Sequence, residues 1–136
     1  FDKVPHQGIL VKLKKLGLSN KLLKWISSFL ANRNFSVSYN KVTSKSHSIQ
    51  CGVPQGSCLS PTLFIAYFSD VVEKIDKQIN VALYADDLAI WYANKSTKKI
   101  EKKLQIAINT IKEFCNKWCL TINKTKTNYC TFTSAG

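Results

Sequence analysis

The sequence predicts an α+β fold, in which antiparallel strands pack on helices. Apolar residues recur at helical spacing in several segments, and other segments alternate with the period of two that is typical of strands. The 136 residues, 45% of them hydrophobic, are enough to bury one continuous core. Because no internal repeat, low-complexity tract or linker interrupts the chain, we expect residues 1–136 to form one domain.

Two helices are expected at the start of the chain. Apolar residues in the segment 9–16 recur at helical spacing, and Gly17 stands where such a helix would end. Ser19 can cap a second helix, whose apolar face extends over residues 22–30. Lysines occupy the opposite face of this helix, which is therefore expected to lie in solvent.

A β-hairpin and a third helix are expected next. Residues 35–39 alternate with period two and residues 46–50 repeat the pattern weakly, which predicts two strands joined by a loop around residues 40–45. Glycine and proline then mark residues 52–56 as a second loop. Amphipathic spacing over residues 59–75 predicts a helix, so this loop leads into a helix N-terminus.

A second hairpin is predicted in the middle of the chain. Two apolar runs, residues 79–84 and 88–92, are separated only by Ala85, Asp86 and Asp87. This is the spacing of two antiparallel strands joined by a tight turn. The two aspartates are therefore expected at the tip of the hairpin.

A long helix and two short strands complete the predicted elements. Thr97 can cap a helix whose apolar stripe runs to Trp118. Residues 120–122 and 129–132 are expected to add short strands on either side of a polar turn at residues 123–128.

The chain is strongly basic, with 20 Lys and Arg residues against 8 Asp and Glu residues and a net charge of +12. A field of this size favours a phosphate-rich partner, and the alternative is a basic surface without a binding role. The lysines that form clusters are candidates for phosphate contacts, although each cluster is equally typical of the solvated face of a helix. These clusters are Lys12, Lys14 and Lys15; Lys21 and Lys24; and Lys98, Lys99, Lys102 and Lys103.

The cysteine pattern supports neither a disulfide framework nor a zinc site. The five cysteines are an odd number without a CxxC pair, and only two histidines are present. Cys115 and Cys119 lie one helical turn apart, which is more typical of small core residues than of metal ligands. No apolar run reaches the ~18 residues of a membrane span, and no signal peptide opens the chain. We therefore expect a reducing, intracellular setting.

Asp86 and Asp87 are the candidate metal ligands. Two unit charges ~4 Å apart repel by about 4 kcal/mol at an effective dielectric near 20, and a divalent cation removes this repulsion. Hard carboxylate oxygens suit Mg²⁺, with Mn²⁺ as an alternative, and Mg²⁺ commonly joins carboxylates to a substrate phosphate. A two-ion site of this kind supports nucleotidyl transfer. The alternative is an ordinary turn, because aspartate favours tight turns for local reasons.

Two motifs extend this interpretation. Tyr84-Ala85-Asp86-Asp87 resembles the YxDD box of reverse transcriptases. Some thirty residues earlier, the segment GVPQGSCLSPTLF at residues 52–64 resembles the loop-and-helix motif of the same enzymes almost letter for letter. The two matches occur in the right order and at a fitting distance.

Both flanks of the chain carry further matches. The segment FDKVPH at residues 1–6 resembles the end of the first palm motif of non-LTR retrotransposon polymerases. The segment LTINKTKT at residues 120–127 resembles their later, lysine-bearing motif. The form of the YxDD box and the motif spacing resemble the LINE or Jockey-like group, with group II intron relatives as an alternative. The resemblance implies a right-hand polymerase palm, with a ferredoxin-like or RRM-like antiparallel sheet packed on helices, and part of the fingers.

The resemblance also implies roles for individual residues. Asp86 would be the principal metal ligand and Asp87 a second, weaker one. Tyr84 and Ala85 would shape the hairpin beside the primer terminus. Lys126 would lie near the pyrophosphate as a general acid, although a lysine on a polar turn is as often simply solvated.

The implied nucleotide pocket involves the first and second motifs. Pro54, Gln55 and Gly56 would line the pocket for the template base and the incoming nucleotide, and glycine there allows close approach of the backbone. Phe1 would match the aromatic gate that excludes a ribose 2′-hydroxyl. The alternatives are a turn that merely begins a helix, and a core phenylalanine or an unanchored terminal residue.

The chain departs from the family pattern at its start. The first palm motif carries a metal-binding aspartate a few residues upstream of the position that Phe1 matches, and Asp2 is not that ligand but is expected to be structural. Both termini look cut, and the thumb, most of the fingers and any endonuclease are expected to lie outside the chain. We therefore expect residues 1–136 alone to have little polymerase activity.

The implied function is that of an RNA-directed DNA polymerase that uses an RNA template, a DNA primer and deoxynucleoside triphosphates, with the nucleus as the expected compartment. A second hypothesis is a remnant that binds nucleic acid through its lysines without catalysis. A third is an RRM-like RNA-binding sheet, whose characteristic Lys/Arg-Gly-Phe aromatic pattern the chain lacks.

Overall fold

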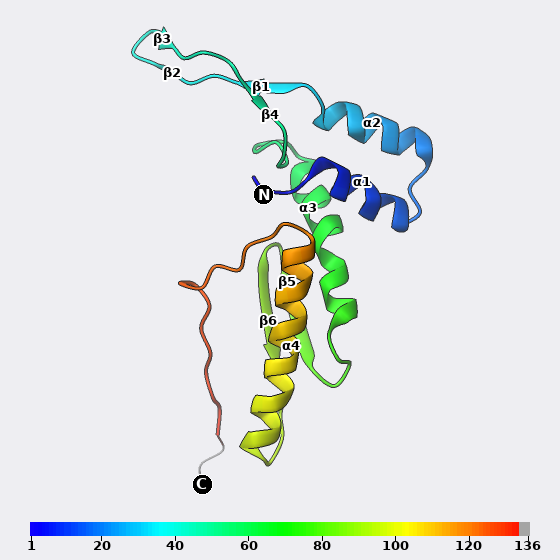
Figure 1. Ribbon diagram of the computed structural model, residues 1–136, viewed down its shortest axis with the longest axis vertical. Coiled ribbons are helices and arrows are strands. Elements are labelled where there is room, and N and C mark those ends of the chain that lie inside the picture. The colour runs from blue at the N-terminus through cyan, green and yellow to red at the C-terminus, as the bar shows by residue number, and fades with distance from the viewer. Residues whose placement is uncertain (134–136) are drawn as a thin grey trace.

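The computed structural model describes residues 1–133 and has a mixed helix and strand fold (Figure 1). A helical part and a long β-hairpin project in different directions, and the three strand pairs do not join into a larger sheet within this range. The elements in order are α1 (His6–Lys15), α2 (Asn20–Leu30), β1 (Arg33–Phe35), β2 (Ser38–Tyr39), β3 (Val42–Thr43), β4 (His47–Ile49), α3 (Ser60–Phe68), the 3₁₀ helix η1 (Ser69–Lys74), β5 (Asn80–Tyr84), β6 (Asp87–Trp91) and α4 (Thr97–Lys117).

The two predicted N-terminal helices are confirmed. Helix α1 ends at Lys15, and Gly17 follows in the left-handed region with φ +86°, as a helix-terminating glycine should. Ser19 caps α2, since its side-chain oxygen accepts a hydrogen bond from the Leu22 N–H at 3.4 Å. The sequence signals at both helix ends were therefore interpreted correctly.

The first hairpin is also confirmed, but the predicted strand 35–39 is broken between β1 and β2, and β3 lies within the segment 40–45 that was expected to be a loop. β1 pairs antiparallel with β4, and β2 pairs antiparallel with β3. Asn40 and Lys41 form the turn at the tip with φ values of 47° and 65°, which are typical of a type I′ turn. Between the two pairs, Val37 accepts a hydrogen bond from the Ser44 N–H at 2.8 Å and donates one to Ser44 Oγ at 2.9 Å.

The third predicted helix is not continuous. The α-helical part α3 ends at Phe68, and residues 69–74 form the tighter turns of η1. Val71 is fully buried in this segment, and its neighbour Asp70 forms an ion pair with Lys12 of α1. These long-range contacts determine the path of the chain here, and amphipathic spacing alone does not encode them.

The second predicted hairpin is confirmed, with Tyr84 opposite Asp87 and Ala82 opposite Ala89, but Asp87 belongs to β6, so the turn is one residue shorter than expected. Its exposure alternates along both strands. Half-buried side chains pack on the core and the opposite face lies in solvent, with Tyr84 84% exposed and Trp91 51% exposed. The half-buried set is Val81, Leu83, Leu88 and Ile90.

The long helix α4 closes the core beside this hairpin (Figure 1). The helix begins at Thr97, so Ser96 and not Thr97 occupies the capping position, and no side chain caps it. Cys115 is buried, which raises the pKa of its thiol, whereas Cys119 is exposed. All five cysteines are free.

The two short strands predicted near the C-terminus are wrong. Residues 118–133 contain no strand, and two aromatic residues of this segment, Tyr129 and Phe132, are 95% and 91% exposed. The Asn123 side chain accepts hydrogen bonds from the Thr125 N–H at 3.1 Å and hydroxyl at 2.7 Å. These bonds form the polar turn predicted at residues 123–128, which is therefore present although the strands on either side of it are not. No helix within residues 1–133 combines the length and apolar character needed to cross a bilayer.

Helix α1 packs closely on α3. A Cβ atom added at Gly8 would lie 2.8 Å from Cε2 of Tyr67, a distance that real Cβ atoms do not reach. Tyr67 is itself fully buried, and its hydroxyl donates a hydrogen bond to the Trp118 carbonyl at the end of α4. Tyr67 therefore joins three helices, and the absence of a side chain at position 8 makes this possible.

Lys12 lies in the core and not on the surface, so its prediction as a phosphate contact is wrong. It is 3% exposed and forms an ion pair with Asp70. Its Nζ lies 3.8 Å from the ring centroid of Trp118 and 4.5 Å from that of Phe114. Burial lowers the pKa of Lys12, and the hydrogen bond to Asp70 opposes this shift. Aromatic faces and one carboxylate thus replace the water that a surface lysine would bind.

We expect Asp70→Asn to destabilise the fold by about 3 kcal/mol, because it leaves the Lys12 ammonium buried without its counter-charge. Adding Lys12→Met should recover most of this loss, since no buried charge then remains. Urea unfolding followed by circular dichroism measures both changes. Asp76→Asn is the matched control, because Asp76 pairs with Lys103 on the surface and its loss should change stability little. Equal effects of Asp70→Asn and Asp76→Asn would contradict the assignment.

Tyr67 should make stability fall at alkaline pH. Burial, with smaller contributions from Cys119 and Asp70, raises its pKa from 10.0 to about 12. The neutral phenol is therefore favoured in the fold, and this stability is present below pH 10 and is lost as the pH rises towards 12. Tyr67→Phe should cost about 1 kcal/mol at neutral pH through the lost hydrogen bond. The difference in free energy of unfolding between wild type and variant should then narrow above pH 10.

Candidate active site

The N-terminal segment, residues 1–5, is bonded to the loop that precedes α3. The Gly52 N–H donates to the Val4 carbonyl at 2.7 Å, and the Val53 N–H donates to the Phe1 carbonyl at 3.1 Å. His6 Nε2 donates to the Gly52 carbonyl at 2.8 Å. Gly52 has φ +87°, and a Cβ there would lie 2.8 Å from the Asp2 carbonyl oxygen. Glycine is therefore required where the two segments meet.

These bonds hold Phe1 in place. Its ring stacks on Phe64 of α3, with centroids 4.4 Å apart and planes inclined by 22°. The ring remains 39% exposed. Phe1 is thus neither a fully buried core residue nor an unanchored terminal residue, and one part of its surface faces solvent.

Asp2 holds the side chain of Gln55. Gln55 Nε2 donates to Asp2 Oδ1 at 2.9 Å, and Cys51 Sγ donates to the Asp2 carbonyl at 3.3 Å. Asp2 therefore has the structural role that was predicted for it, because it holds the Gln55 side chain. Its carboxylate fixes the direction of an amide whose carbonyl oxygen is left free to accept a further hydrogen bond.

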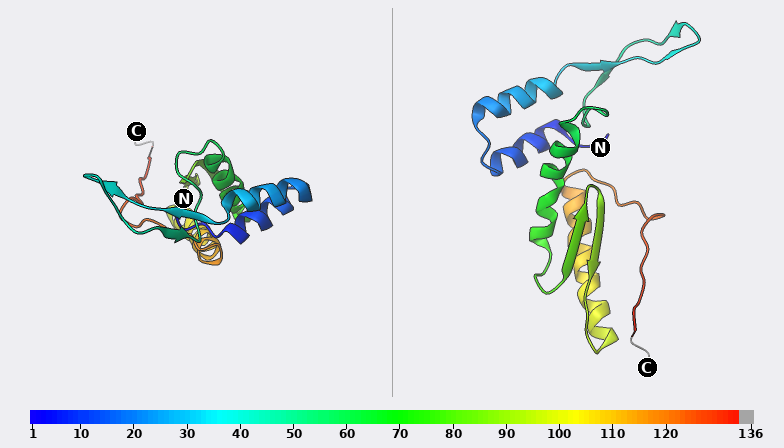
Figure 2. Two further views of the ribbon diagram at one scale, coloured as in Figure 1. Left: turned by 90° about the horizontal axis from the view of Figure 1, so that it is seen from above. Right: turned by 180° about the vertical axis from the view of Figure 1, so that it is seen from behind.

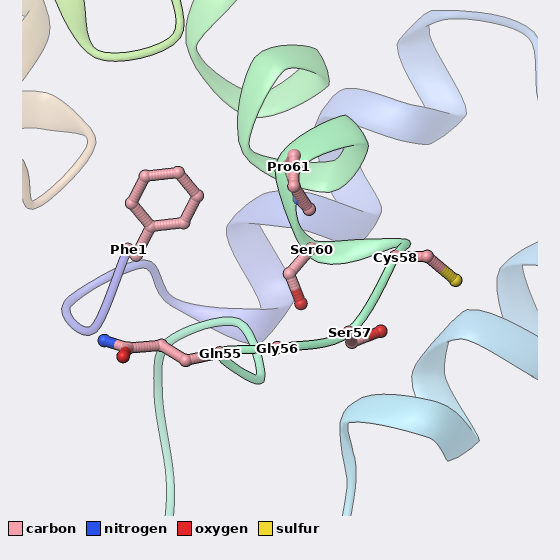
Figure 3. A pocket seen from close by; sticks show the side chains of 7 residues that line it. All are labelled: Phe1, Gln55, Gly56, Ser57, Cys58, Ser60 and Pro61. Carbon is pink, nitrogen blue, oxygen red and sulfur yellow. The ribbon is translucent and has the colours of Figure 1, made fainter.

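A cavity of about 460 Å³ lies between Phe1 and the start of α3 (Figure 3). It is largely open to solvent, and its lining is mainly apolar. The cavity lies beside the start of α3, whose Ser60 N–H is already bonded to the Ser57 carbonyl at 3.3 Å. Phe1 and Gln55 approach it from two different segments of the chain. The lining residues are Phe1, Gln55, Gly56, Ser57, Cys58, Ser60 and Pro61.

The cavity includes three of the four residues predicted for a nucleotide pocket. Phe1, Gln55 and Gly56 line it, whereas Pro54 does not. The Pro54 carbonyl instead accepts hydrogen bonds from Ser57 and Ser60 and so braces the loop from behind. Gly56 has φ +82°, and a Cβ added there would meet no atom within 4 Å, so its backbone is accessible to a ligand.

Four lining residues were not among the predicted site residues: Ser57, Cys58, Ser60 and Pro61. They belong to the same segment that carried the second motif, so the signal was present in the sequence. The motif was interpreted through Gln55 and Gly56, while the helix start that follows them forms the remaining wall of the cavity. The contact of Phe1 with Phe64 left no signal in the sequence, because it joins residues 63 positions apart.

The tip of the β5–β6 hairpin carries the two candidate carboxylates. Ala85 and Asp86 form the turn, and Asp87 is the first residue of β6. Both aspartates are exposed, and neither carboxylate accepts a hydrogen bond or forms an ion pair within residues 1–133. Solvent therefore screens their repulsion, and the case for a metal rests on their hard oxygen donors and not on a desolvation penalty.

Ala85 occupies the left-handed region with φ +52°. Such a backbone conformation is unfavourable for residues other than glycine by roughly 1–2 kcal/mol. Strained residues of this kind are concentrated at functional sites. The turn of the hairpin thus has an unfavourable backbone conformation at Ala85, and the two carboxylates beside it lie in solvent.

The hairpin tip points towards the part of the molecule that holds the N-terminus and the start of α3, both in Figure 1 and in the rear view of Figure 2. Lys126 is not brought into the cavity. It lies in the exposed segment after α4, where its N–H donates to Asn123 Oδ1 at 3.3 Å. No group of three His, Cys, Asp or Glu side chains within residues 1–133 is arranged to hold a metal. The hairpin therefore offers two carboxylates as a partial ligand set.

Comparison with known proteins decides the family. The family model described as reverse transcriptase (RNA-dependent DNA polymerase) matches residues 1–134. The chain belongs to the reverse transcriptase family. Enzymes of this family use divalent metal ions, so the exposed carboxylates of the hairpin tip are in keeping with the family's chemistry.

The relatives identify the branch of the family. The RNA-directed DNA polymerase from mobile element jockey of Drosophila funebris is 36% identical over 141 residues, and that of Drosophila melanogaster is 36% identical over 138 residues. These matches cover 99% and 97% of the chain. The probable RNA-directed DNA polymerase from transposon BS of Drosophila melanogaster is 32% identical over 93% of the chain. The predicted resemblance to a Jockey-like, non-LTR reverse transcriptase is confirmed. The chain spans 15% of the length of each of these relatives.

We expect Gly52→Ala to loosen the cavity. A Cβ at this position meets the Asp2 backbone in addition to the unfavourable φ, and overpacking of this kind costs about 1–3 kcal/mol. Gly17→Ala is the matched control, because Gly17 has nearly the same φ, +86°, with no atom near a Cβ. Urea unfolding should show a larger loss for Gly52→Ala than for Gly17→Ala. Equal losses of stability in the two variants would mean that the contact with residues 1–5 does not require glycine at position 52.

Proposed function

We propose that this chain forms the palm and part of the fingers of an RNA-directed DNA polymerase encoded by a non-LTR retrotransposon. The observation that carries the proposal is the cavity between Phe1 and the start of α3. The hairpin tip that carries Asp86 and Asp87 points towards the same part of the molecule (Figure 1). Nucleotidyl transfer needs such a pairing of a nucleotide pocket with exposed carboxylates. The relatives provide independent support, because the names of the two jockey proteins describe RNA-directed DNA polymerases.

Asp86 and Asp87 would hold Mg²⁺, with Mn²⁺ as an alternative. Both carboxylates are exposed and free of protein partners within the described range, as ligands of a hydrated hard cation need to be. When bound, the ion would supply Lewis acidity to the attacking 3′-hydroxyl and to the phosphate oxygens. Asp86 lies in the turn itself and is proposed as the principal ligand, and Asp87, at the first position of β6, as the second. Tyr84, 84% exposed beside them, would contact the primer end together with Ala85.

The cavity would receive the incoming deoxynucleoside triphosphate. Gln55, held by Asp2, would direct its free amide oxygen towards the nucleotide, and Gly56 would allow close approach of the backbone. Phe1, fixed by its stacking on Phe64, would act as the gate that excludes a ribose 2′-hydroxyl. Lys126 remains a proposal as general acid, and it would need the exposed segment after α4 to move towards the pyrophosphate.

The partners proposed are an RNA template and a DNA primer, in accord with the net charge of +12. The nucleus remains the compartment that the family resemblance implies. We further propose that residues 1–136 alone do not extend a primer. Two neighbouring carboxylates from one turn leave a two-ion site without a ligand on its opposite side, and no third acidic side chain is grouped with them in the described part of the chain.

A second candidate is a protein that binds nucleic acid without catalysis. The incomplete metal ligand set favours it, because binding through lysines needs no carboxylates. The two functions differ in the consequence of removing Asp86, which should abolish catalysis but leave binding through lysines intact.

We expect Asp86→Asn to abolish primer extension in a longer polypeptide that contains this chain with the regions that flank it in its relatives. The loss should exceed the ~100-fold that accompanies removal of an outer-shell partner of a metal ligand, because a direct ligand is removed. The assay measures extension of a DNA primer on an RNA template with Mg²⁺ and deoxynucleotides.

Asp76→Asn is the matched control for this assay. It makes the same chemical change at an aspartate that pairs with Lys103, and extension should persist. Extension at wild-type rate by the Asp86→Asn variant would refute the metal role of the hairpin tip. Loss of extension in both variants would point to a general effect of charge.

A further inference from the structure

The β-hairpin formed by residues 33–49, hereafter the arm, projects from the helical part of the molecule (Figures 1 and 2). Every residue from 34 to 48 is exposed, and only Arg33 and Ile49 at its base are half-buried. A two-stranded hairpin without a covered face is marginally stable in water. We therefore expect a binding partner to stabilise the arm.

The arm carries large apolar side chains that no other residue within 1–133 covers. Tyr39 is 76% exposed and lies opposite Val42, which is 72% exposed. Phe35 is 50% exposed and lies opposite His47, with ring centroids 5.7 Å apart. Val37, between them, is 60% exposed. The exposed rings are therefore spaced along β1 and β2, the first half of the arm, and neither packs on the hydrophobic core.

The charge of the arm has one sign. Residues 3–69 contain nine Lys and Arg residues and no Asp or Glu residue. Within the arm the cations are Arg33, Lys41 and Lys45. Two copies that paired arm to arm would bring like charges together, whereas a polyanion would be attracted along the whole length of the arm.

We propose that the arm binds single-stranded nucleic acid, with Lys41 and Lys45 contacting phosphates and the rings of Phe35 and Tyr39 stacking on bases. Exposed aromatic rings among cations are the combination that binds single strands, because every unpaired base has a face for stacking. A duplex offers its phosphates but keeps its bases stacked on one another. Phe35 and Tyr39 lie four residues apart on an extended chain, about 13 Å, so each can take a separate base.

This surface is distinct from the cavity and the hairpin tip. No residue of the arm lines the cavity. Binding to the arm needs neither a metal ion nor a nucleotide, so a measurement made without them is independent of the proposed polymerase function. Failure of primer extension would leave the arm proposal standing, and failure of arm binding would leave the polymerase proposal standing.

The test is fluorescence anisotropy with the full 136-residue chain and three labelled probes: an oligouridine, an oligothymidine and a mixed-sequence duplex of equal length. The double variant Phe35→Ala with Tyr39→Ala should bind both single strands about tenfold more weakly or worse, since stacking contributes at each base. Its affinity for the duplex should change little. If one single strand binds more tightly, that result identifies RNA or DNA as the natural partner. Equal binding supports recognition of phosphates and base faces, which RNA and DNA have in common.

Two matched controls separate the arm from the general surface. Tyr129→Ala with Phe132→Ala removes two aromatic rings that are even more exposed, outside the arm, and should leave binding unchanged. Lys41→Ala with Lys45→Ala should weaken binding and reduce its salt dependence more than Lys98→Ala with Lys99→Ala, although both pairs remove two charges. Because all arm positions substituted are exposed, the urea midpoint of each variant should stay at the wild-type value.

Three results would overturn the proposal. The first is wild-type affinity in the Phe35 and Tyr39 double variant. The second is a wild-type chain that binds the duplex as tightly as the single strands, or binds no probe. The third is a dimer in analytical ultracentrifugation that the double variant dissociates without loss of oligonucleotide affinity, since the arm would then be a contact between copies.

Discussion

The buried ion pair between Lys12 and Asp70 is the contact on which the arrangement of the helices depends. It joins α1 to η1, and the rings of Phe114 and Trp118 bring α4 to the same point. Burial lowers the pKa of Lys12, and the hydrogen bond and charge of Asp70 raise it by less. The desolvation of the ammonium group is therefore the larger effect. Such a pair adds little net free energy to the fold, although removal of either partner alone leaves a buried charge uncompensated.

The candidate active site follows from this packing. Residues 1–5 lead directly into α1, so the position of α1 determines where Phe1 meets Phe64 and where Asp2 meets Gln55. On the other side, α4 closes the core beside the β5–β6 hairpin. The cavity and the carboxylate turn are therefore built on elements that the same charged contact holds together, although neither lies next to it.

Local patterns in the sequence predicted the helices, both hairpins and the turn that carries Asp86, because periodicity and turn chemistry act over a few residues. The features that escaped prediction depend on distant partners. Lys12 resembles any other surface lysine until Asp70, 58 residues away, is placed beside it. The strands expected after α4 would need a partner strand, and none within residues 1–133 pairs with them. Family motifs identified Gln55 and Gly56, but the wall formed by the start of α3 required the folded chain.

Gly8 affects the candidate active site through the packing of α1, although it lies outside the site. Its missing side chain lets α1 approach Tyr67 closely, and the segment that ends in Phe1 is continuous with that helix. Any methyl group there would push the helix outward and carry the aromatic ring of residue 1 with it. A substitution at residue 8 would therefore reshape the wall of the cavity that Phe1 forms, although residue 8 itself does not line the cavity.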